Sequence, residues 1–402
     1  MDSNLPEQPV ITIDLGEQRI TLLGTAHVSR VSAEAVKSML GSKQYDAVAV
    51  ELCPSRHNTM VSPDSMARMD LFQVIREGKV AMVAASLALG AFQQRLADQF
   101  GVKPGAEMLE AVEYAQSEKI PIFLVDREVG ITLKRIYHNI PWWQRLNLMS
   151  GLFASVVSRE KVNEEDIERL KEGDLLESTF SQFAQQSQSL FLPLIDERDR
   201  YMAARLLQEV EKQSFRNILV IVGAGHLRGI EKYILQSSNK QNRPEQVIDE
   251  LEVVPVSRGW LKIVPWVIVG LVLLGFTLGF SHSSDLGWSL VAGWVLINGG
   301  LSALGAAIAA AHPLTIVGAF IAAPLTSLNP MVGAGMVTAT IEIYLRKPKV
   351  ADFNHLKHDT THLKGWWKNR VTRILLIFIL STLGSAIGTY VAGFFIFERL
   401  TR

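Results

Sequence analysis

Two histidines follow glycines at the same spacing and in the same local context. The stretch LLGTAHVS places His27 three residues after Gly24, and VIVGAGHLRG places His226 three residues after Gly223. In both stretches an apolar run stops at Gly-x-x-His, which is typical of a buried strand that ends in a tight glycine turn. The repeated pattern suggests that two imidazole groups are delivered to one site.

Carboxylates and arginines end two further apolar runs. DAVAVEL leads into Glu51 and then Arg56, whereas IPIFLVD ends at Asp126. Imidazole and carboxylate groups are ordinary ligands of divalent first-row metals, and such a site leaves a position open for water. The metal lowers the pKa of that water and polarises a carbonyl. We therefore predict that His27, His226 and Glu51 bind one divalent ion: Mn, Co or Zn.

The remaining polar residues after these runs could take part in the hydrolysis of an acyl bond. Arg56 and Arg127 are expected to orient a carboxylate or carbonyl through bidentate contacts. Asp126, or Asp199 from the stretch IDERDRYMA, is expected to accept a proton from the metal-bound water. The predicted reaction is hydrolysis of a peptide or other acyl bond. The alternative is that both histidines only hydrogen-bond the loops around them.

The elements that position these residues alternate between strands and helices. Short apolar strands separated by amphipathic helices predict an α/β domain with a mostly parallel sheet flanked by helices. In such a sheet, ligands bind at the carboxyl edge of the strands, where all the candidate residues fall. The expected strands are 19–24, 46–52, 120–126 and 217–223, and the clearest helices are 29–40, 104–119 and 200–213.

Composition narrows the class of protein. With 402 residues the chain is longer than a usual single core, so two domains are expected. Forty basic and forty acidic residues balance, which gives no overall field for nucleic acid. The single cysteine, Cys53, excludes an intramolecular disulfide and suits a reducing compartment. The N-terminal residues lack the charged and apolar regions of a signal peptide, so none is expected.

The C-terminal third contains uncharged apolar runs long enough to span a bilayer. We expect an α/β domain over 1–258 and an all-α integral membrane domain over 259–402, with the lipid bilayer as its partner. Small residues, among them Gly384 and Gly388, allow helices to approach closely and favour a homo-oligomer through the Gly/Ala-rich helices. The predicted spans are 263–280, 288–311 and 371–396.

The segment 313–345 is too long for one span and short for two, and it is interrupted at Asn329-Pro330. Basic residues precede the first span and fill the loop 346–370, so the positive-inside rule places both in the cytoplasm. A re-entrant pair of half-helices satisfies this rule, and a single kinked helix is the alternative. The prediction is an inner (plasma) membrane protein whose α/β domain is cytoplasmic.

Polar residues inside the apolar third are candidates for function by default. They include Glu342, His312 and Asn298. Glu342 lies four residues before Arg346, so an ion pair within one helix is the alternative to a transport site.

The chain resembles the TraB/pheromone-shutdown (PrgY) family, within the wider Tiki, GumN, ChaN and erythromycin-esterase-like superfamily. The resemblance covers nearly the whole chain. Its motifs are GTAHVS (24–29), VELCPSR (50–56), PGAEM (104–108), DREVGITLKR (126–135), DERDRYMA (196–203), VGAGHLRGI (222–230), AHPLTIVGAFIAAPLTSLNP (311–330) and RKPKVADF (346–353).

The resemblance implies an erythromycin-esterase/ChaN-like α/β domain with paired Gly-x-x-His motifs. Tiki relatives are metal-dependent proteases, pheromone-shutdown relatives limit a peptide pheromone, and other members bind haem or hydrolyse an ester without a metal. Besides an enzyme, the family therefore allows a non-enzymatic membrane module that binds haem or a peptide, with His27 and His226 as haem ligands. Substrate contacts are expected from Arg135, Arg198 and Glu107, which lie in three of the motifs.

Overall fold

The chain folds into two compact units. One is made of Met1–Ser65 and Phe92–Pro255, and the other of Met66–Ala91 and Val256–Arg402. The predicted boundary at residue 258 lies outside the residues that the structure describes. The structure, a computed structural model, describes residues 8–25, 30–61, 70–80, 82–84, 86–88, 90–91, 94, 105–141, 144, 187–212, 215–238, 243–254, 263–329 and 331–401.

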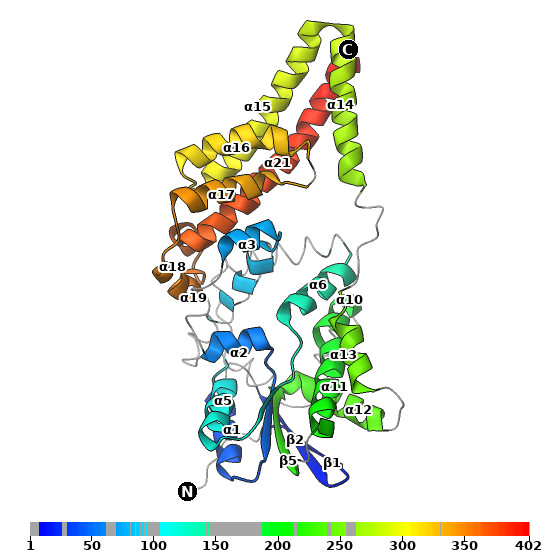
Figure 1. The fold of residues 1–402 in the computed structure, drawn as a ribbon, viewed down its shortest axis with the longest axis vertical. Helices are drawn as coiled ribbons and strands as arrows, with labels where there is room; N and C mark the ends of the chain where they lie inside the picture. Colours follow the sequence, from blue (N-terminus) through cyan, green and yellow to red (C-terminus); the bar gives the residue numbers. More distant parts are fainter. Residues whose placement is uncertain are drawn as a thin grey trace. The chain divides into compact units, whose positions relative to one another are not determined.

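The first unit is built on a five-stranded sheet with the order β1-β2-β5-β3-β4 (Figure 1). β2, β5, β3 and β4 run parallel, whereas β1 pairs antiparallel with β2. The mostly parallel α/β sheet is thus confirmed, and β5 lies directly between β2 and β3. The strands are β1 (Val10–Leu15), β2 (Gln18–Thr25), β3 (Ala47–Val50), β4 (Ile122–Leu124) and β5 (Asn217–Gly223).

β1 lies outside the four strands expected from the sequence. Its residues alternate in VITIDL, and a two-residue turn joins it to β2. Gly16 in that turn has a φ of +65°, a conformation that glycine adopts without steric cost. The alternation and the glycine together were the available signs of a hairpin.

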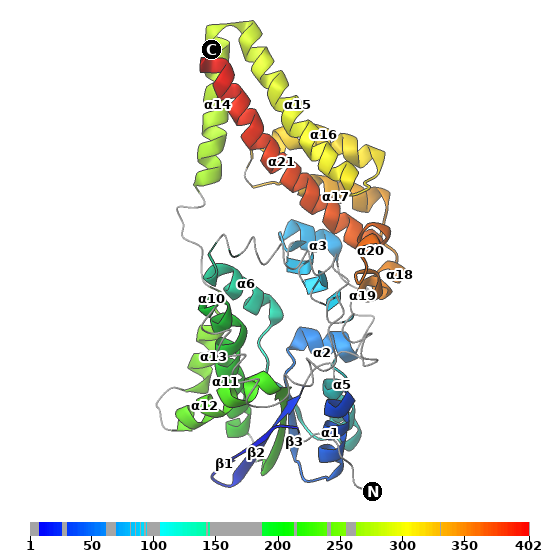
Figure 2. The same ribbon diagram turned by 180° about the vertical axis from the view of Figure 1, so that it is seen from behind.

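Helices cover both faces of the sheet (Figure 2). Leu23 faces a core cluster with Val36 and Met108, whereas Leu22 faces a cluster with Met202. Because both faces are covered, the central strands are apolar at nearly every position. The first face is covered by α1 (Arg30–Gly41) and α5 (Ala106–Glu118), and the second by α11 (Glu197–Lys212) and α12 (Leu227–Ser238).

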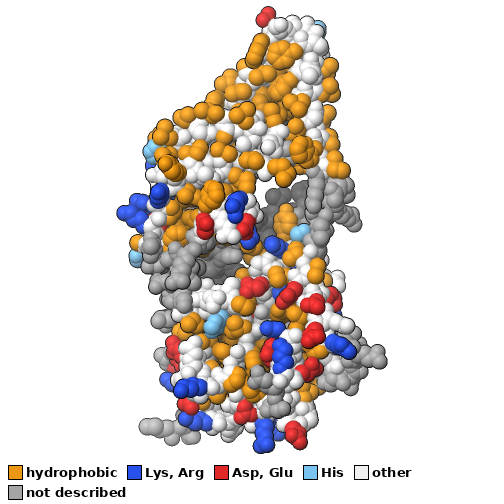
Figure 3. Space-filling model, viewed as in Figure 1, with side chains coloured by type: hydrophobic (Ala, Val, Ile, Leu, Met, Phe, Trp, Pro, Cys, Tyr) orange, Lys and Arg blue, Asp and Glu red, His pale blue; other side chains and the backbone are white. Residues whose placement is uncertain are grey.

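The second unit is helical, and hydrophobic side chains dominate the face of it seen in Figure 3. Three of its helices are long and apolar enough to cross a membrane, by length and composition, and they overlap the three predicted spans. They are α14 (Val264–His282), α15 (Ser284–Ile308) and α21 (Arg370–Thr401). Shorter helices are α3 (Leu71–Arg76), α16 (Pro313–Thr326), α17 (Ala334–Leu345), α18 (Val350–Asn354), α19 (Leu356–Asp359) and α20 (Leu363–Lys368).

α16 and α17 form an antiparallel hairpin. At its open end Thr315 Oγ1 donates to Glu342 Oε2 at 2.7 Å, and further along Gly318 lies against the side chain of Ile341. At its tip Ser327 Oγ contacts the amide of Asn298, in the second half of α15, and Ser385 Oγ at 2.8 Å. The open end of the hairpin therefore lies at one end of the α15–α21 pair, and its tip lies part-way along that pair.

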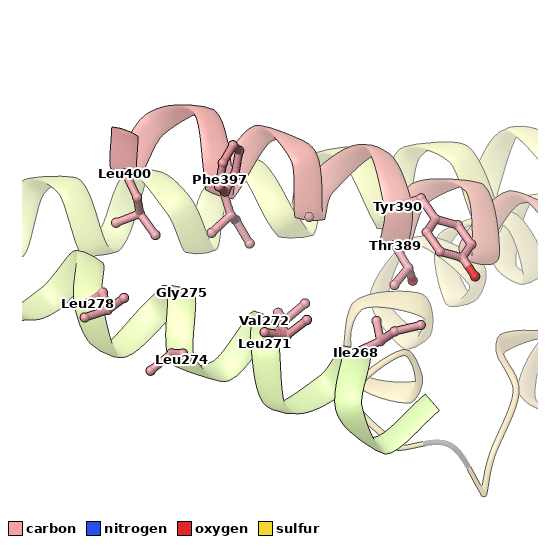
Figure 4. A pocket seen from close by; sticks show the side chains of 12 residues that line it. Ile268, Leu271, Val272, Leu274, Gly275, Leu278, Thr389, Tyr390, Phe397 and Leu400 are labelled. Carbon is pink, nitrogen blue, oxygen red and sulfur yellow. The ribbon is translucent and has the colours of Figure 1, made fainter. Parts of the chain in front are cut away.

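An apolar groove of about 420 Å³ runs between α14 and α21 (Figure 4). Leu271 and Leu274 from α14 and Phe397 from α21 are among the side chains that line it. Leu271 is 62% exposed and Phe397 is 64% exposed. Contiguous exposed apolar surface marks a contact with lipid or with another protein rather than with water.

Candidate functional site

Three of the predicted site residues meet at the carboxyl edge of the sheet. Glu51 directly follows β3, Asp126 follows β4 by two residues, and His226 ends the short 3-10 helix η3 (Ala224–His226) after β5. Parallel neighbouring strands end at the same edge, which is why these three side chains lie together. His27, two residues after β2, lies outside the described residues.

Glu51 is buried and tied to the neighbouring strand. Its Oε2 accepts a hydrogen bond from the backbone N–H of Gly223 at 2.6 Å. β3 and β5 pair in the register Val50↔Ile221, so the residue after β3 faces the end of β5. The other carboxylate oxygen, Oε1, accepts from Arg198 Nη2 at 2.5 Å. Both oxygens of Glu51 are therefore engaged.

Arg198 is the centre of the cluster. Its Nε and Nη2 donate to the two oxygens of Asp126, each at 2.9 Å, in a bidentate pair. Its Nη1 lies 3.2 Å from His226 Nε2. Burial lowers the pKa of Arg198, but the carboxylates of Asp126 and Glu51 outweigh it, so the pKa is raised and the guanidinium stays charged. From its motif, Arg198 was expected to contact substrate; in the structure it links the acidic groups.

His226 is held by Asp199. Its Nδ1 lies 2.5 Å from Asp199 Oδ1, and both side chains are buried. A proton on Nδ1 serves this bond and leaves the lone pair of Nε2 facing Arg198 and Glu51 Oε1, the latter at 3.5 Å. Burial raises the pKa of Asp199 to about 6, against the opposing effect of the hydrogen bond to His226. This pair has the geometry of an oriented general base.

At the start of α11 the consecutive residues Glu197, Arg198 and Asp199 bind different partners, and the local fold explains how. α10 (Gln188–Phe191) continues into the π-helical turn η2 (Leu192–Asp196) and then into α11. A π-helical turn contains an extra residue and changes which side chains face the sheet; such turns are frequent at functional sites. Directly after it, Arg198 reaches the carboxylates and Asp199 reaches His226.

A second ion-pair network lies beside this cluster. Arg127 is buried and donates to Thr132 Oγ1 and to Glu197 Oε2 at 2.9 Å, as well as to two backbone carbonyls. Arg135 binds both oxygens of Glu197, at 2.6 and 2.8 Å. These contacts connect α6 (Val129–Asn139), η2 and α13 (Pro244–Glu252). The guanidinium groups of Arg127 and Arg135 thus bind Glu197 rather than the cluster around Arg198.

Two further predicted residues differ in their surroundings. Arg56, on α2 (Pro54–Val61), has a side chain that is 40% exposed, with Nη1 3.9 Å from Asp126 Oδ2. Among the described arginines of this region it has the most exposed side chain, so it can meet a ligand that approaches from solvent. Glu107 is buried in the first turn of α5, and the contacts of Arg198 and His226 given above do not include it.

Three contacts of this region were not predicted from the sequence. The N–H of Gly223 binds Glu51, Glu197 pairs with two arginines, and Gly229 leaves room for Asp199. Gly223 and Glu197 both belong to motifs that were singled out, GAGH and DERDR. The signal for Gly229 was its place three residues after His226, on the first turn of a helix where glycine is otherwise unfavourable.

A divalent ion does not fit this arrangement of contacts. Within the described part of the chain no group of three or more His, Cys, Asp or Glu side chains is arranged to hold a metal ion. The physical reason is Arg198, because its guanidinium contacts Glu51 Oε1 and His226 Nε2, where a cation would have to bind. Glu51 and His226 therefore do not form a metal site while Arg198 is in this position. The predicted contribution of His27 lies outside the described residues.

Known sequences agree with the two-part architecture. The profile of the TraB/PrgY/gumN family matches residues 10–246, and that of the TraB family protein C-terminal domain matches residues 260–401. An uncharacterized protein of Methanocaldococcus jannaschii is 30% identical over 391 residues, which covers 94% of each chain.

TraB domain-containing proteins of Homo sapiens and Mus musculus are 27% and 29% identical over 254 and 261 residues. These alignments cover 57% of this chain and 66% of the mammalian proteins. The mammalian similarity is therefore partial, whereas the archaeal similarity extends through both units. The resemblance expected from the motifs is confirmed: the chain belongs to the TraB/PrgY/gumN family.

Proposed function

We propose that the first unit hydrolyses a peptide or other acyl bond, with His226 as the general base. The observation that carries this proposal is the Asp199–His226–Glu51 arrangement. Nδ1 of His226 is bound to Asp199 at 2.5 Å, and Nε2 is directed into the cluster. Strongly shifted titratable groups gather at active sites, and the raised pKa of Asp199 fits that pattern.

In the proposed mechanism, Arg198 Nη1 moves away from His226 Nε2 when substrate binds. Nε2 then accepts a proton from water while the water oxygen attacks the substrate carbonyl carbon. The negative charge that develops on the carbonyl oxygen is stabilised by the half-exposed guanidinium of Arg56. The protonated His226 then donates its proton to the leaving nitrogen or oxygen as the acyl bond breaks. Asp199 is a positioning residue in this scheme, since it fixes the tautomer and orientation of His226.

Arg198 supplies the counter-charge of Glu51 and Asp126 in a buried setting. Two buried carboxylates without a cation would take up protons or repel each other. With Arg198 bound to both, their outer lone pairs remain able to accept hydrogen bonds from a substrate amide or ammonium group. Arg198→Lys keeps the charge but loses the bidentate contact, so we expect it to lower the hydrolytic rate.

A divalent ion held by His27, His226 and Glu51 is the metal-dependent form of the same proposal. When bound, such an ion supplies a water of lowered pKa. It requires the guanidinium of Arg198 to leave Glu51 and His226. The two forms predict different metal contents, so they are separated by elemental analysis of the purified protein.

The deciding experiment combines metal content with hydrolysis. Full-length protein purified in detergent is screened against peptide and ester libraries, with and without Mn, Co or Zn, as wild type, His226→Gln and Asp199→Asn. His138→Gln is the matched control, because His138 Nδ1 contacts a carbonyl of its own helix. We expect hydrolysis that is lost in His226→Gln and kept in His138→Gln.

Each remaining outcome has a clear reading. Metal-dependent activity that disappears in His27→Ala and His226→Ala together with the bound metal supports the metal-dependent form. A folded wild-type protein that cleaves nothing under any of these conditions overturns the hydrolase. A Soret band with added haem that is lost in His27→Ala then indicates the non-enzymatic ligand-binding module.

We further propose that the second unit is inserted in the inner (plasma) membrane with the α/β unit in the cytoplasm. The support is the three long apolar helices, together with a hairpin whose two ends lie at one end of the α15–α21 pair. An N-terminal tag should be digested by protease in inverted membrane vesicles and protected in right-side-out ones. The opposite pattern contradicts the orientation, and extraction of the protein by alkaline carbonate contradicts the insertion.

A further inference from the structure

One end of the second unit gathers positive charge. The chain from Arg346 to Arg373 contains eight Lys and Arg residues against two Asp. This region joins the end of α17 to the start of α21 and includes α18, α19 and α20. Lys347, Lys349 and Lys368 are exposed on it. We refer to residues 346–373 as the basic end.

Side chains of the basic end donate hydrogen bonds to backbone carbonyls at the C-terminal end of α15. Arg346 Nη1 donates to the carbonyl of Ala310 at 3.1 Å, and Trp367 Nε1 donates to that of Ile308 at 2.7 Å. Arg370 Nη1 donates to the carbonyl of Lys347 at 3.0 Å. The arginines are therefore held in place by the backbone and are not free surface side chains.

Arg373 is the least compensated of these arginines. Within the described part of the chain its Nε–H is buried and has no hydrogen-bond acceptor. The acceptor described for its Nη1 is the carbonyl of Trp367 at 3.5 Å, the upper limit for such a bond. The charges of Arg346 and Arg370 also act on it, as do those of Glu342 and Asp352. A guanidinium group in this setting lacks a strong anionic partner.

The nearby carboxylates are already engaged. Glu342 Oε2 accepts from the N–H of His312 at 2.9 Å and from Thr315 Oγ1, and Oε1 pairs with Arg346 at 3.3 Å. Asp352 Oδ2 accepts from the N–H of Lys349 at 2.7 Å and lies 3.9 Å from Arg370 Nε. Because Glu342 and Asp352 already bind other donors, the surroundings of Arg373 keep a net positive charge.

The surroundings select the kind of anion. The basic end adjoins helices long and apolar enough to cross a membrane, and it carries the part-exposed Trp367. Tryptophan and basic side chains are enriched where a protein meets lipid headgroups. In Figure 3 basic side chains lie directly beside the hydrophobic surface of this unit. Phosphate is a favoured partner of clustered arginines because its oxygens match their fork of N–H donors.

We propose that the basic end binds the phosphate of an anionic phospholipid, with Arg370 and Arg373 as its main contacts and Lys347 and Lys349 as outer ones. This inference goes beyond hydrolysis and rests on the proposed membrane insertion. Alkaline carbonate extraction, done first, tests the insertion separately from the lipid site. The lipid site would fix the hairpin's open end at the level of the headgroups.

The test uses delipidated full-length protein in detergent and native mass spectrometry. Phosphatidylglycerol is titrated against phosphatidylcholine on wild type, Arg370→Gln, Arg373→Gln and the double variant Lys347→Gln/Lys349→Gln. The matched control is Arg399→Gln, which removes an exposed arginine near the other end of α21. We expect wild type to prefer phosphatidylglycerol, and each charge removed to weaken its binding roughly fivefold.

The controls decide the remaining outcomes. Arg399→Gln should bind like wild type, and equal weakening in Arg399→Gln and Arg370→Gln overturns the site. Equal binding of the two lipids by wild type also overturns it. Inorganic phosphate that binds as well as phosphatidylglycerol overturns the lipid assignment in favour of a free anion. If Arg373→Gln does not fold, the lysine double variant, which changes only exposed side chains, still decides the proposal.

Discussion

The carboxylate of Asp199 occupies the space in which a side chain at Gly229 would begin. A Cβ atom placed on Gly229 would overlap Oδ2 and the carboxyl carbon of Asp199. Gly229 lies on the first turn of α12, three residues after His226. The glycine thus allows α12 and α11 to approach closely enough for Asp199 to bind His226.

We predict that Gly229→Ala lowers hydrolysis by about 10²-fold, because displacement of Asp199 releases His226 from its orientation. The crowding should also reduce stability, by about 1–3 kcal/mol. Gly41→Ala is the control, since a Cβ at Gly41 meets no atom within 4 Å. Rates and thermal midpoints of both variants are to be measured in the same detergent. Equal effects of the two substitutions would contradict the proposed role of Gly229.

The meeting of Glu51, Asp126 and His226 could be predicted from sequence because parallel strands share a carboxyl edge. Each of these residues comes directly or a few residues after an apolar run, which places it at the carboxyl end of a strand. The delivery of two imidazole groups to one site implied only that β2 and β5 lie close in the sheet, and did not place β5 between β2 and β3. Strand order depends on long-range pairing, which local patterns do not encode.

The central position of Arg198 could not be predicted in the same way. It lies directly after a π-helical turn, and periodicity arguments assume a regular helix. The contacts of Arg127 and Arg135 with Glu197 were hidden for a similar reason, because Glu197 reaches them from the same irregular junction. Because the partners of an arginine depend on tertiary packing, its presence in a motif does not reveal them.

The pH dependence of hydrolysis should follow the Asp199–His226 pair. Burial raises the pKa of Asp199 to about 6, so the carboxylate that orients His226 becomes protonated below that pH. We expect the rate to rise with pH through about 6, an apparent value that belongs to the coupled pair. Asp199→Asn should lower the rate by about 10²–10⁴-fold and remove this limb. Asp14→Asn, at an exposed ion pair, should leave the profile unchanged.

Glu197 should contribute stability that disappears in acid. Burial raises its pKa, but hydrogen bonds from Arg135 and Arg127 outweigh burial and hold the pKa below its usual value. The folded state thus favours the ionised form. Its stabilising effect is complete above the unfolded pKa of about 4.3 and is lost as the pH falls through the lower folded value.

We predict that Glu197→Gln lowers stability at pH 7 by about 3–5 kcal/mol, because it leaves the buried Arg127 without its carboxylate. The gap between wild type and variant should narrow below about pH 4. Thermal midpoints from pH 7 down to pH 3 measure it. Glu250→Gln is the control, since the side chain of Glu250 is 59% exposed and surface pairs contribute about 0–1 kcal/mol. A gap that stays constant with pH would argue against the ion pair.

The crossing of α15 and α21 depends on glycines within one chain. A Cβ on Gly384 would overlap the carbonyl of Leu301, and one on Gly305 would overlap that of Leu380. These small residues were expected to allow close approach of helices, either within the chain or between copies. The structure uses them within the chain, so the predicted homo-oligomer would have to use another face or remain absent.

We therefore predict that Gly384→Ala lowers stability and that Gly393→Ala does not. In Gly384→Ala the helices must separate at Leu301, and the thermal midpoint in detergent should fall by several degrees. In Gly393→Ala no atom lies within 4 Å of the new methyl group. Alanine is favoured over glycine in a helix interior by about 1 kcal/mol, so this variant should be neutral or more stable. A Gly384→Ala protein that keeps its midpoint but loses its oligomeric state in size-exclusion chromatography would place Gly384 between copies instead.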